Sequence, residues 1–150
     1  MKRILSIIVA LVAFAGVAEA QITIKKSADK PKQLTTLSMS WSWLYQMDNA
    51  YFIVLKSDNQ FDDRFWLKIG SSRDECLESL SALKDMIDNM EDSDRYEIEN
   101  GEGETFYVSL MRELGIKKLA FHSDRNAGSG FLLASNISKA LKWIEQNVKE

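Results

Sequence analysis

The segment SMSWSWLYQM, residues 38–47, decides how the chain is layered. Its large apolar side chains recur at every second position, and serines and one leucine lie between them. These alternate positions are Met39, Trp41, Trp43 and Tyr45. Alternate side chains of a β-strand point to the same side, so the four would share one face. We therefore expect a strand over 36–46 whose apolar stripe packs against helices, because an apolar strand face usually covers the core.

Further strands with a period of two are expected on both sides of a long amphipathic helix. Their expected bounds are 51–56, 64–69, 95–99, 104–111, 117–122 and 130–135. The helix begins after Ser72, where Glu75 completes a capping box, and a last helix follows Ser135 or Asn136 as its N-cap. This order predicts an α+β fold in two layers, with a mainly antiparallel sheet of six to seven strands and two helices on one face.

The two halves of the chain can be aligned with each other. The Ser-Asp pairs at 57–58 and 123–124 coincide, as do apolar positions after them. We interpret 35–92 and 93–150 as two strand–strand–strand–helix units, and a chance likeness between two amphipathic stretches is the alternative. Two units are too few for a solenoid, so we expect one α+β domain over 35–150.

The first twenty residues have the pattern of a bacterial-type signal peptide. A basic start precedes a long apolar run, which ends in the small-residue motif A-E-A at 18–20. Because the run is too short to span a bilayer, a retained anchor is the less favoured alternative. We expect cleavage between Ala20 and Gln21 and a secreted or periplasmic protein without a membrane span. Residues 21–34 would then form a polar lead-in to the domain.

Composition argues against several classes of function. The chain has 22 acidic and 19 basic residues, a formal net charge of −3. Binding of nucleic acid requires a basic face, so we expect no nucleic-acid partner. Cys76 is the only cysteine and there is one histidine, so neither a disulfide framework nor a typical zinc site is expected. No cofactor is predicted.

Trp66 is the first candidate for a ligand-binding residue. It lies on the opposite strand face from its apolar neighbours, so we expect it at the surface with Lys68 beside it. The aromatic stripe is a further candidate if it is exposed, since large exposed apolar patches usually mark binding sites. Its members would then be Trp41, Trp43 and Tyr45.

Two groups of residues could support catalysis or metal binding, and each also has a simpler interpretation. Cys76 near a helix start and His122 at a strand end follow the order of papain-like thiol hydrolases. Acidic neighbours raise a thiol pKa and Cys76 falls on the buried stripe, so we expect an inert core cysteine. Asp58, Asp62 and Asp63 are oxygen ligands of the kind that bind Ca²⁺, but their spacing fails the EF-hand pattern. We expect them to form a solvated hairpin loop.

No group of nucleophile, base and oxyanion donor assembles from the sequence. The favoured interpretation is therefore a non-catalytic domain that binds an envelope or extracellular protein, peptide or glycan. A thiol hydrolase that uses Cys76 and His122 is one alternative. A structural or assembly protein of the cell envelope is another, and it would form a homodimer along a sheet edge.

Overall fold

The computed structural model describes residues 30–100 and 103–149. The predicted leader 1–20 and most of the lead-in 21–34 lie outside the described residues. In chain order the elements are β1 (Lys32–Ser38), β2 (Ser42–Met47), β3 (Ala50–Leu55), β4 (Phe65–Gly70), α2 (Arg73–Asn89), β5 (Arg95–Glu99), β6 (Thr105–Glu113), β7 (Ile116–His122), β8 (Gly130–Leu133) and α3 (Ala134–Asn147). The strand β1 therefore begins within the predicted lead-in.

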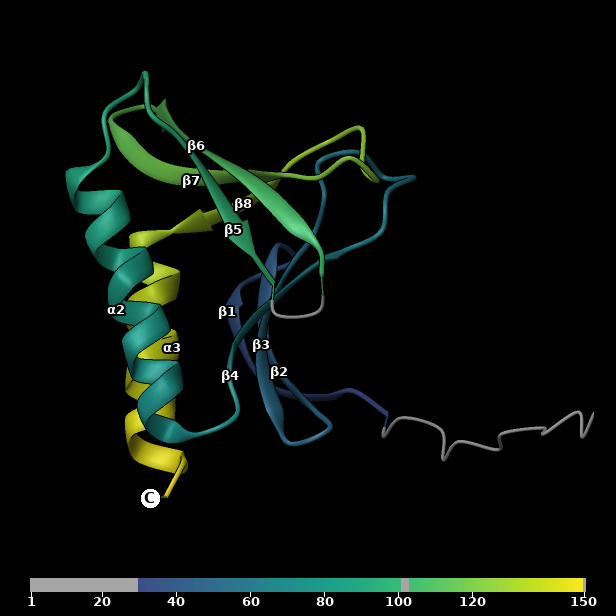
Figure 1. Cartoon of the computed structure of the whole chain (residues 1–150), viewed down its shortest axis with the longest axis vertical. Coiled ribbons are helices and arrows are strands. Elements are labelled where there is room, and N and C mark those ends of the chain that lie inside the picture. The colour runs from purple at the N-terminus through teal and green to yellow at the C-terminus, as the bar shows by residue number, and fades with distance from the viewer. Residues whose placement is uncertain (1–29, 101–102, 150) are drawn as a thin grey trace, which may run out of the picture.

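The strands form two antiparallel sheets of four, ordered β1-β2-β3-β4 and β5-β6-β7-β8 (Figure 1). The predicted α+β fold is confirmed, whereas the single sheet of six to seven strands is wrong. Strands that follow one another directly in the chain usually pair, and this accounts for each four-stranded meander. The helix α2 separates β4 from β5, so the second meander begins a new sheet. Among the described residues, one isolated bridge between Ser57 and Gly130 pairs the backbones of the two sheets.

Each half of the described chain has the same order of elements, four strands followed by a helix. The first half has one more strand than predicted. The range 36–46, expected as one strand, contains the end of β1, a turn and most of β2. The shared order does not by itself test a common origin. Duplication of one unit remains a prediction.

A turn at residues 39–41 separates β1 from β2, and Ser40 adopts a positive φ of 66° there. Met39 and Trp41 consequently lie outside the sheet, with 86% and 45% of their surface exposed. The expectation that the aromatic stripe packs against the helices is wrong. Trp43 and Tyr45 are on β2, but they lie on the sheet face that points away from the helices.

The register with β3 and β4 decides which side of β2 faces the core. Leu44 pairs with Ile53, Ile53 pairs with Leu67, and all three side chains are buried. On the same face the buried Asn136 of α3 donates its amide to the hydroxyl of Ser42 at 3.0 Å. Both faces of β2 carry apolar residues, so its own alternation could not show which face is inside.

The helices α2 and α3 lie side by side on one side of the molecule (Figure 1). Ser72 caps α2 as predicted, and its hydroxyl accepts the Glu75 N–H at 3.3 Å. The helix α3 begins directly after β8 and has no side-chain cap, so the predicted cap Asn136 is instead a buried residue inside the helix. No helix among residues 30–100 and 103–149 combines the length and the apolar character that crossing a bilayer requires.

One hydrophobic core joins the two sheets and the two helices. It contains Leu80 and Ile144 from the helices together with residues from the inner faces of both sheets. The rings of Phe65 on β4 and Phe106 on β6 lie 6.0 Å apart and connect the sheets directly. This shared core fixes the two sheets relative to each other, and with them the loops at which the sheets meet.

Candidate functional site

The outer face of the first sheet carries a cluster of aromatic side chains. The ring centroids of Tyr45 and Trp66 are 5.3 Å apart, and those of Phe52 and Trp66 are 5.9 Å apart. The guanidinium of Arg64 lies 4.7 Å from the centre of the Trp43 ring. Trp43, Tyr45 and Trp66 are half-buried, whereas Phe52 between them is buried. The structure therefore brings together three of the predicted ligand-binding residues.

The register of the strands explains this cluster. One cross-strand row contains Trp43, Val54 and Trp66, and the next contains Tyr45, Phe52 and Lys68. Directly opposed side chains on one face are close enough to pack. Lys68 thus lies on the same face as Trp66, as predicted, while Trp41 lies in the β1–β2 turn and takes no part in the cluster.

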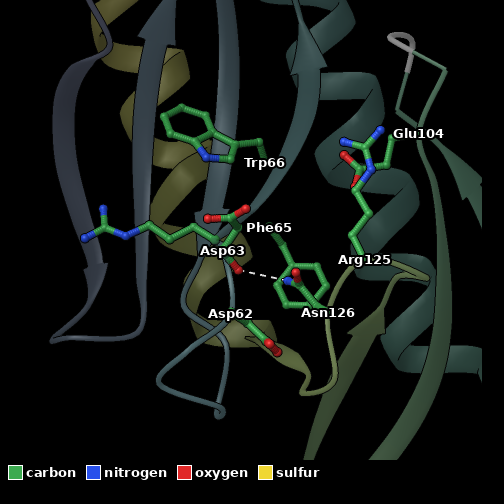
Figure 2. A pocket seen from close by; sticks show the side chains of 8 residues that line it. Asp62, Asp63, Phe65, Trp66, Glu104, Arg125 and Asn126 are labelled. Carbon is green, nitrogen blue, oxygen red and sulfur yellow. Dashed lines mark hydrogen bonds between the residues drawn. The ribbon is translucent and has the colours of Figure 1, made fainter.

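A cleft of about 570 Å³ opens beside Trp66, where the two sheets meet (Figure 2). Trp66 and Asp63 form one side of it. Arg125 and Asn126 come from the β7–β8 loop, and Glu104 precedes β6. In Figure 2 Arg125 and Glu104 are on the side of the cleft opposite Trp66. The cleft is thus built from both halves of the chain.

Contacts between the β3–β4 loop and the β7–β8 loop hold the base of the cleft. The carboxylate of Asp62 accepts the Gly128 N–H at 2.6 Å and the Ser57 hydroxyl at 3.0 Å. The Asp58 carboxylate accepts the Ser129 N–H at 2.7 Å. The hydrogen bond from the Gly128 N–H is the main reason why the pKa of Asp62 lies below its ordinary value.

The three aspartates considered for calcium have separate roles in these loops. Asp58 and Asp62 bind backbone N–H groups of the opposite loop, and Asp63 lines the cleft. Among the residues that the structure describes, no three or more His, Cys, Asp or Glu side chains form a group that could hold a metal ion. The geometry therefore gives no support to the calcium interpretation.

Three charged groups in the cleft are available to a ligand. The side chains of Asp63, Glu104 and Arg125 make no hydrogen bond or ion pair with other described residues. Asn126, in contrast, donates its amide to the backbone carbonyl of Asp63 at 2.8 Å and so joins the two loops. Arg64 also lines the cleft, but its guanidinium lies over the Trp43 ring. Next to Trp66 the cleft therefore offers two carboxylate acceptors and one guanidinium donor that make no hydrogen bond or ion pair with other described residues.

Asn100, which the sequence did not single out, positions the strand that carries Trp66. This buried residue follows β5, and its side-chain amide lies along the backbone of β4. The amide donates to the Trp66 carbonyl at 2.6 Å and accepts the Lys68 N–H at 2.8 Å. Asn100 thereby pairs with backbone groups of β4 as a neighbouring strand would.

Cys76 and His122 do not form the pair that a thiol hydrolase needs. Cys76 is fully buried, and burial together with the charge of Glu75 raises the pKa of its thiol to about 11. The two ring nitrogens of His122 lie 3.0 Å from the Ser129 hydroxyl and 3.5 Å from the Ser109 hydroxyl. Cys76 is not among these partners, and its thiol is not ionised at neutral pH.

The chain matches no protein-family model, no curated protein and no solved structure. The main feature of the cleft is the Trp66 indole, which lies beside charged side chains that make no hydrogen bond or ion pair with other described residues. Six of the eight residues that line the cleft are polar or charged, so a ligand that makes several hydrogen bonds suits it better than an apolar one.

Proposed function

We propose that this chain is an exported, non-catalytic binding module that recognises a saccharide in the cleft beside Trp66. One observation carries the proposal: the indole shares the cleft with the free carboxylates of Asp63 and Glu104 and the free guanidinium of Arg125. A sugar ring has an apolar face, which packs on an indole, and hydroxyl groups, which donate to carboxylates and accept from a guanidinium. Its chemistry is therefore complementary to both parts of the cleft.

A saccharide fits this cleft better than a peptide or a folded protein does. The volume of about 570 Å³ falls in the range of small-molecule sites. A peptide could instead extend the first sheet at the edge strand β4. The side chain of Asn100 already takes the Trp66 carbonyl and the Lys68 N–H on that edge, so an added strand would have to displace it.

Export is part of the proposal and rests on the sequence pattern of residues 1–20. An exported module of this kind would meet glycans of the cell envelope or the extracellular space. Mass spectrometry of the protein from an expressing cell tests this point directly. We expect a chain that begins at Gln21 and is found outside the cytoplasm, and an intact Met1 in the cytoplasm would contradict it.

A glycan array tests the proposed ligand class. We expect the chain from Gln21 to bind at least one class of oligosaccharide. Arg125→Ala should weaken binding about tenfold, since a hydrogen bond to a charged group contributes about 1.5 kcal/mol or more. Arg125 is exposed and bonds to no other described residue, so this change should leave the fold intact.

Phe61→Ala is the matched control. Phe61 lies in the β3–β4 loop, which also contains Asp63; it is 87% exposed and does not line the cleft. The Phe61→Ala variant should bind the same glycans on the array as the unchanged chain. If no glycan class binds, or if Arg125→Ala and Phe61→Ala behave alike, the proposed site is wrong.

A further inference from the structure

The β6–β7 hairpin has an apolar residue at a position that disfavours it. Glu113 pairs with Ile116, so the loop between them consists of Leu114 and Gly115 alone. Both loop residues have positive φ angles, 51° and 81°. Two-residue hairpin loops of this geometry favour asparagine, aspartate or glycine, because other side chains are strained there. Leu114 therefore weakens the hairpin that it closes.

A second hairpin of the same chain provides an internal comparison. Met47 pairs with Ala50, and the two residues between them also have positive φ angles, 50° and 62°. They are Asp48 and Asn49, which are residue types that this geometry prefers. Leu114 is also 98% exposed, so no packing contact offsets its strain. A strained and exposed leucine points to a role outside the folded core.

Leu114 belongs to a larger apolar surface that we call the tip surface. It consists of the exposed side chains of Met39, Trp41, Leu114 and Ile116, which are 86%, 45%, 98% and 55% exposed. The β1–β2 turn and the β6–β7 hairpin meet at a groove of about 410 Å³, which Trp41, Leu114 and Ile116 line. Both turns thus contribute large apolar side chains to one groove, and Met39 lies in the same turn as Trp41.

Two lysines, Lys56 and Lys118, lie beside the tip surface, although the chain as a whole has a net charge of −3. The ammonium of Lys56 lies 5.5 Å from the centre of the Trp41 ring, and that of Lys118 lies 4.2 Å from the Phe131 ring. Glu113 pairs with Lys118. The ammonium of Lys117 donates to the backbone carbonyl of Asp88. Neither Lys117 nor Lys56 has a carboxylate partner among the described residues.

We infer that the tip surface inserts into the surface of an anionic lipid membrane. Apolar side chains beside lysines are the pattern of proteins that lie in the membrane interface. Tryptophan and lysine side chains prefer that region, where an indole or an aliphatic stem is buried and the charged end stays in water. Anionic headgroups attract the unpaired lysines. A second copy of the chain suits the surface less well, because it would bring the same cations face to face.

Co-sedimentation with lipid vesicles tests this inference independently of the saccharide site. The chain from Gln21 is mixed with vesicles of phosphatidylcholine, with and without phosphatidylglycerol. We expect it to sediment with the vesicles that contain phosphatidylglycerol. Leu114→Asn should lower this partitioning about tenfold, since burial of one leucine side chain is lost. Lys56→Ala should lower it about fivefold with anionic vesicles only.

The same Leu114→Asn variant should have a higher Tm than the unchanged chain, because asparagine suits the loop. A raised Tm with lost partitioning separates a binding defect from a folding defect. Phe61→Asn removes another large apolar side chain, which is 87% exposed and lies outside the tip surface, and this variant should partition normally. The inference fails if the unchanged chain ignores anionic vesicles or if Leu114→Asn partitions normally. It also fails if sedimentation without lipid reveals a dimer that Leu114→Asn dissociates.

Discussion

Asn100 donates its side-chain amide to the carbonyl oxygen of Trp66 at 2.6 Å, and this bond joins the end of β5 to β4. The same side chain accepts the Lys68 N–H at 2.8 Å. The principal aromatic residue of the cleft is therefore held by a residue of the other half of the chain. Changes at Asn100 should affect both the stability of the fold and the shape of the cleft.

Asn100→Ala removes the side-chain partner of the Trp66 carbonyl and of the Lys68 N–H, which are both part-buried. We expect the free energy of unfolding to fall by about 1–3 kcal/mol, since each lost hydrogen bond contributes about 0.5–1.5 kcal/mol. Urea denaturation measures this. Asn147→Ala is the control, because Asn147 makes a similar bond to the Trp143 carbonyl at 2.8 Å but is exposed. Equal losses in the two variants would show that Asn100 has no special role.

The stability of the protein should depend on the ionisation of Asp62. Its pKa in the folded state lies below the ordinary value of 3.8, mainly because the Gly128 N–H bonds to the carboxylate. A lowered pKa means that the stabilisation is present above pH 3.8 and is lost as the pH falls through the folded-state pKa. Melting curves of the unchanged chain should therefore show a decline in Tm below about pH 4.

Asp62→Asn should have a lower Tm near neutral pH and a smaller decline in acid. Asp63→Asn is the matched control, because the Asp63 carboxylate makes no hydrogen bond with other described residues. It should follow the pH dependence of the unchanged chain. If the Tm of Asp62→Asn has the same pH dependence as that of the unchanged chain, the contact between the β3–β4 and β7–β8 loops does not depend on the Asp62 carboxylate.

Cys76 should not react with thiol reagents while the protein is folded. The thiol is fully buried and its pKa is raised to about 11, so access and ionisation are both suppressed at neutral pH. We expect labelling by a maleimide only after denaturant is added. Labelling of the native protein at the rate of a free thiol would contradict the buried position and reopen the thiol hydrolase interpretation.

The helices could be predicted because each carries one apolar stripe with a clear period. On α2, for example, Leu80 and Ile87 belong to this stripe and are buried in the core. The strand over 36–46 was predicted wrongly, because β2 is apolar on both faces and its orientation depends on pairing between Leu44 and Ile53. A turn that contains Ser40 at a positive φ also has no strong sequence signal.

The site could be predicted only in part. The alternation of β4 placed Trp66 on the outer face with Lys68, and the structure agrees. Asn100, Glu104 and Arg125 were missed, because they reach the cleft only through the docking of the two sheets. Local patterns contain no information on which loops of two separate sheets will meet.

The most direct test of the saccharide proposal is to observe the Trp66 indole while a ligand binds. Each tryptophan gives one indole N–H signal in a ¹H–¹⁵N spectrum, and Trp66→Phe assigns the signal of interest. On titration with the oligosaccharide that binds best on the array, we predict that the Trp66 signal shifts while the Trp41 signal stays in place. A titration in which the Trp66 signal does not move, or in which only distant residues respond, would contradict a saccharide site in this cleft.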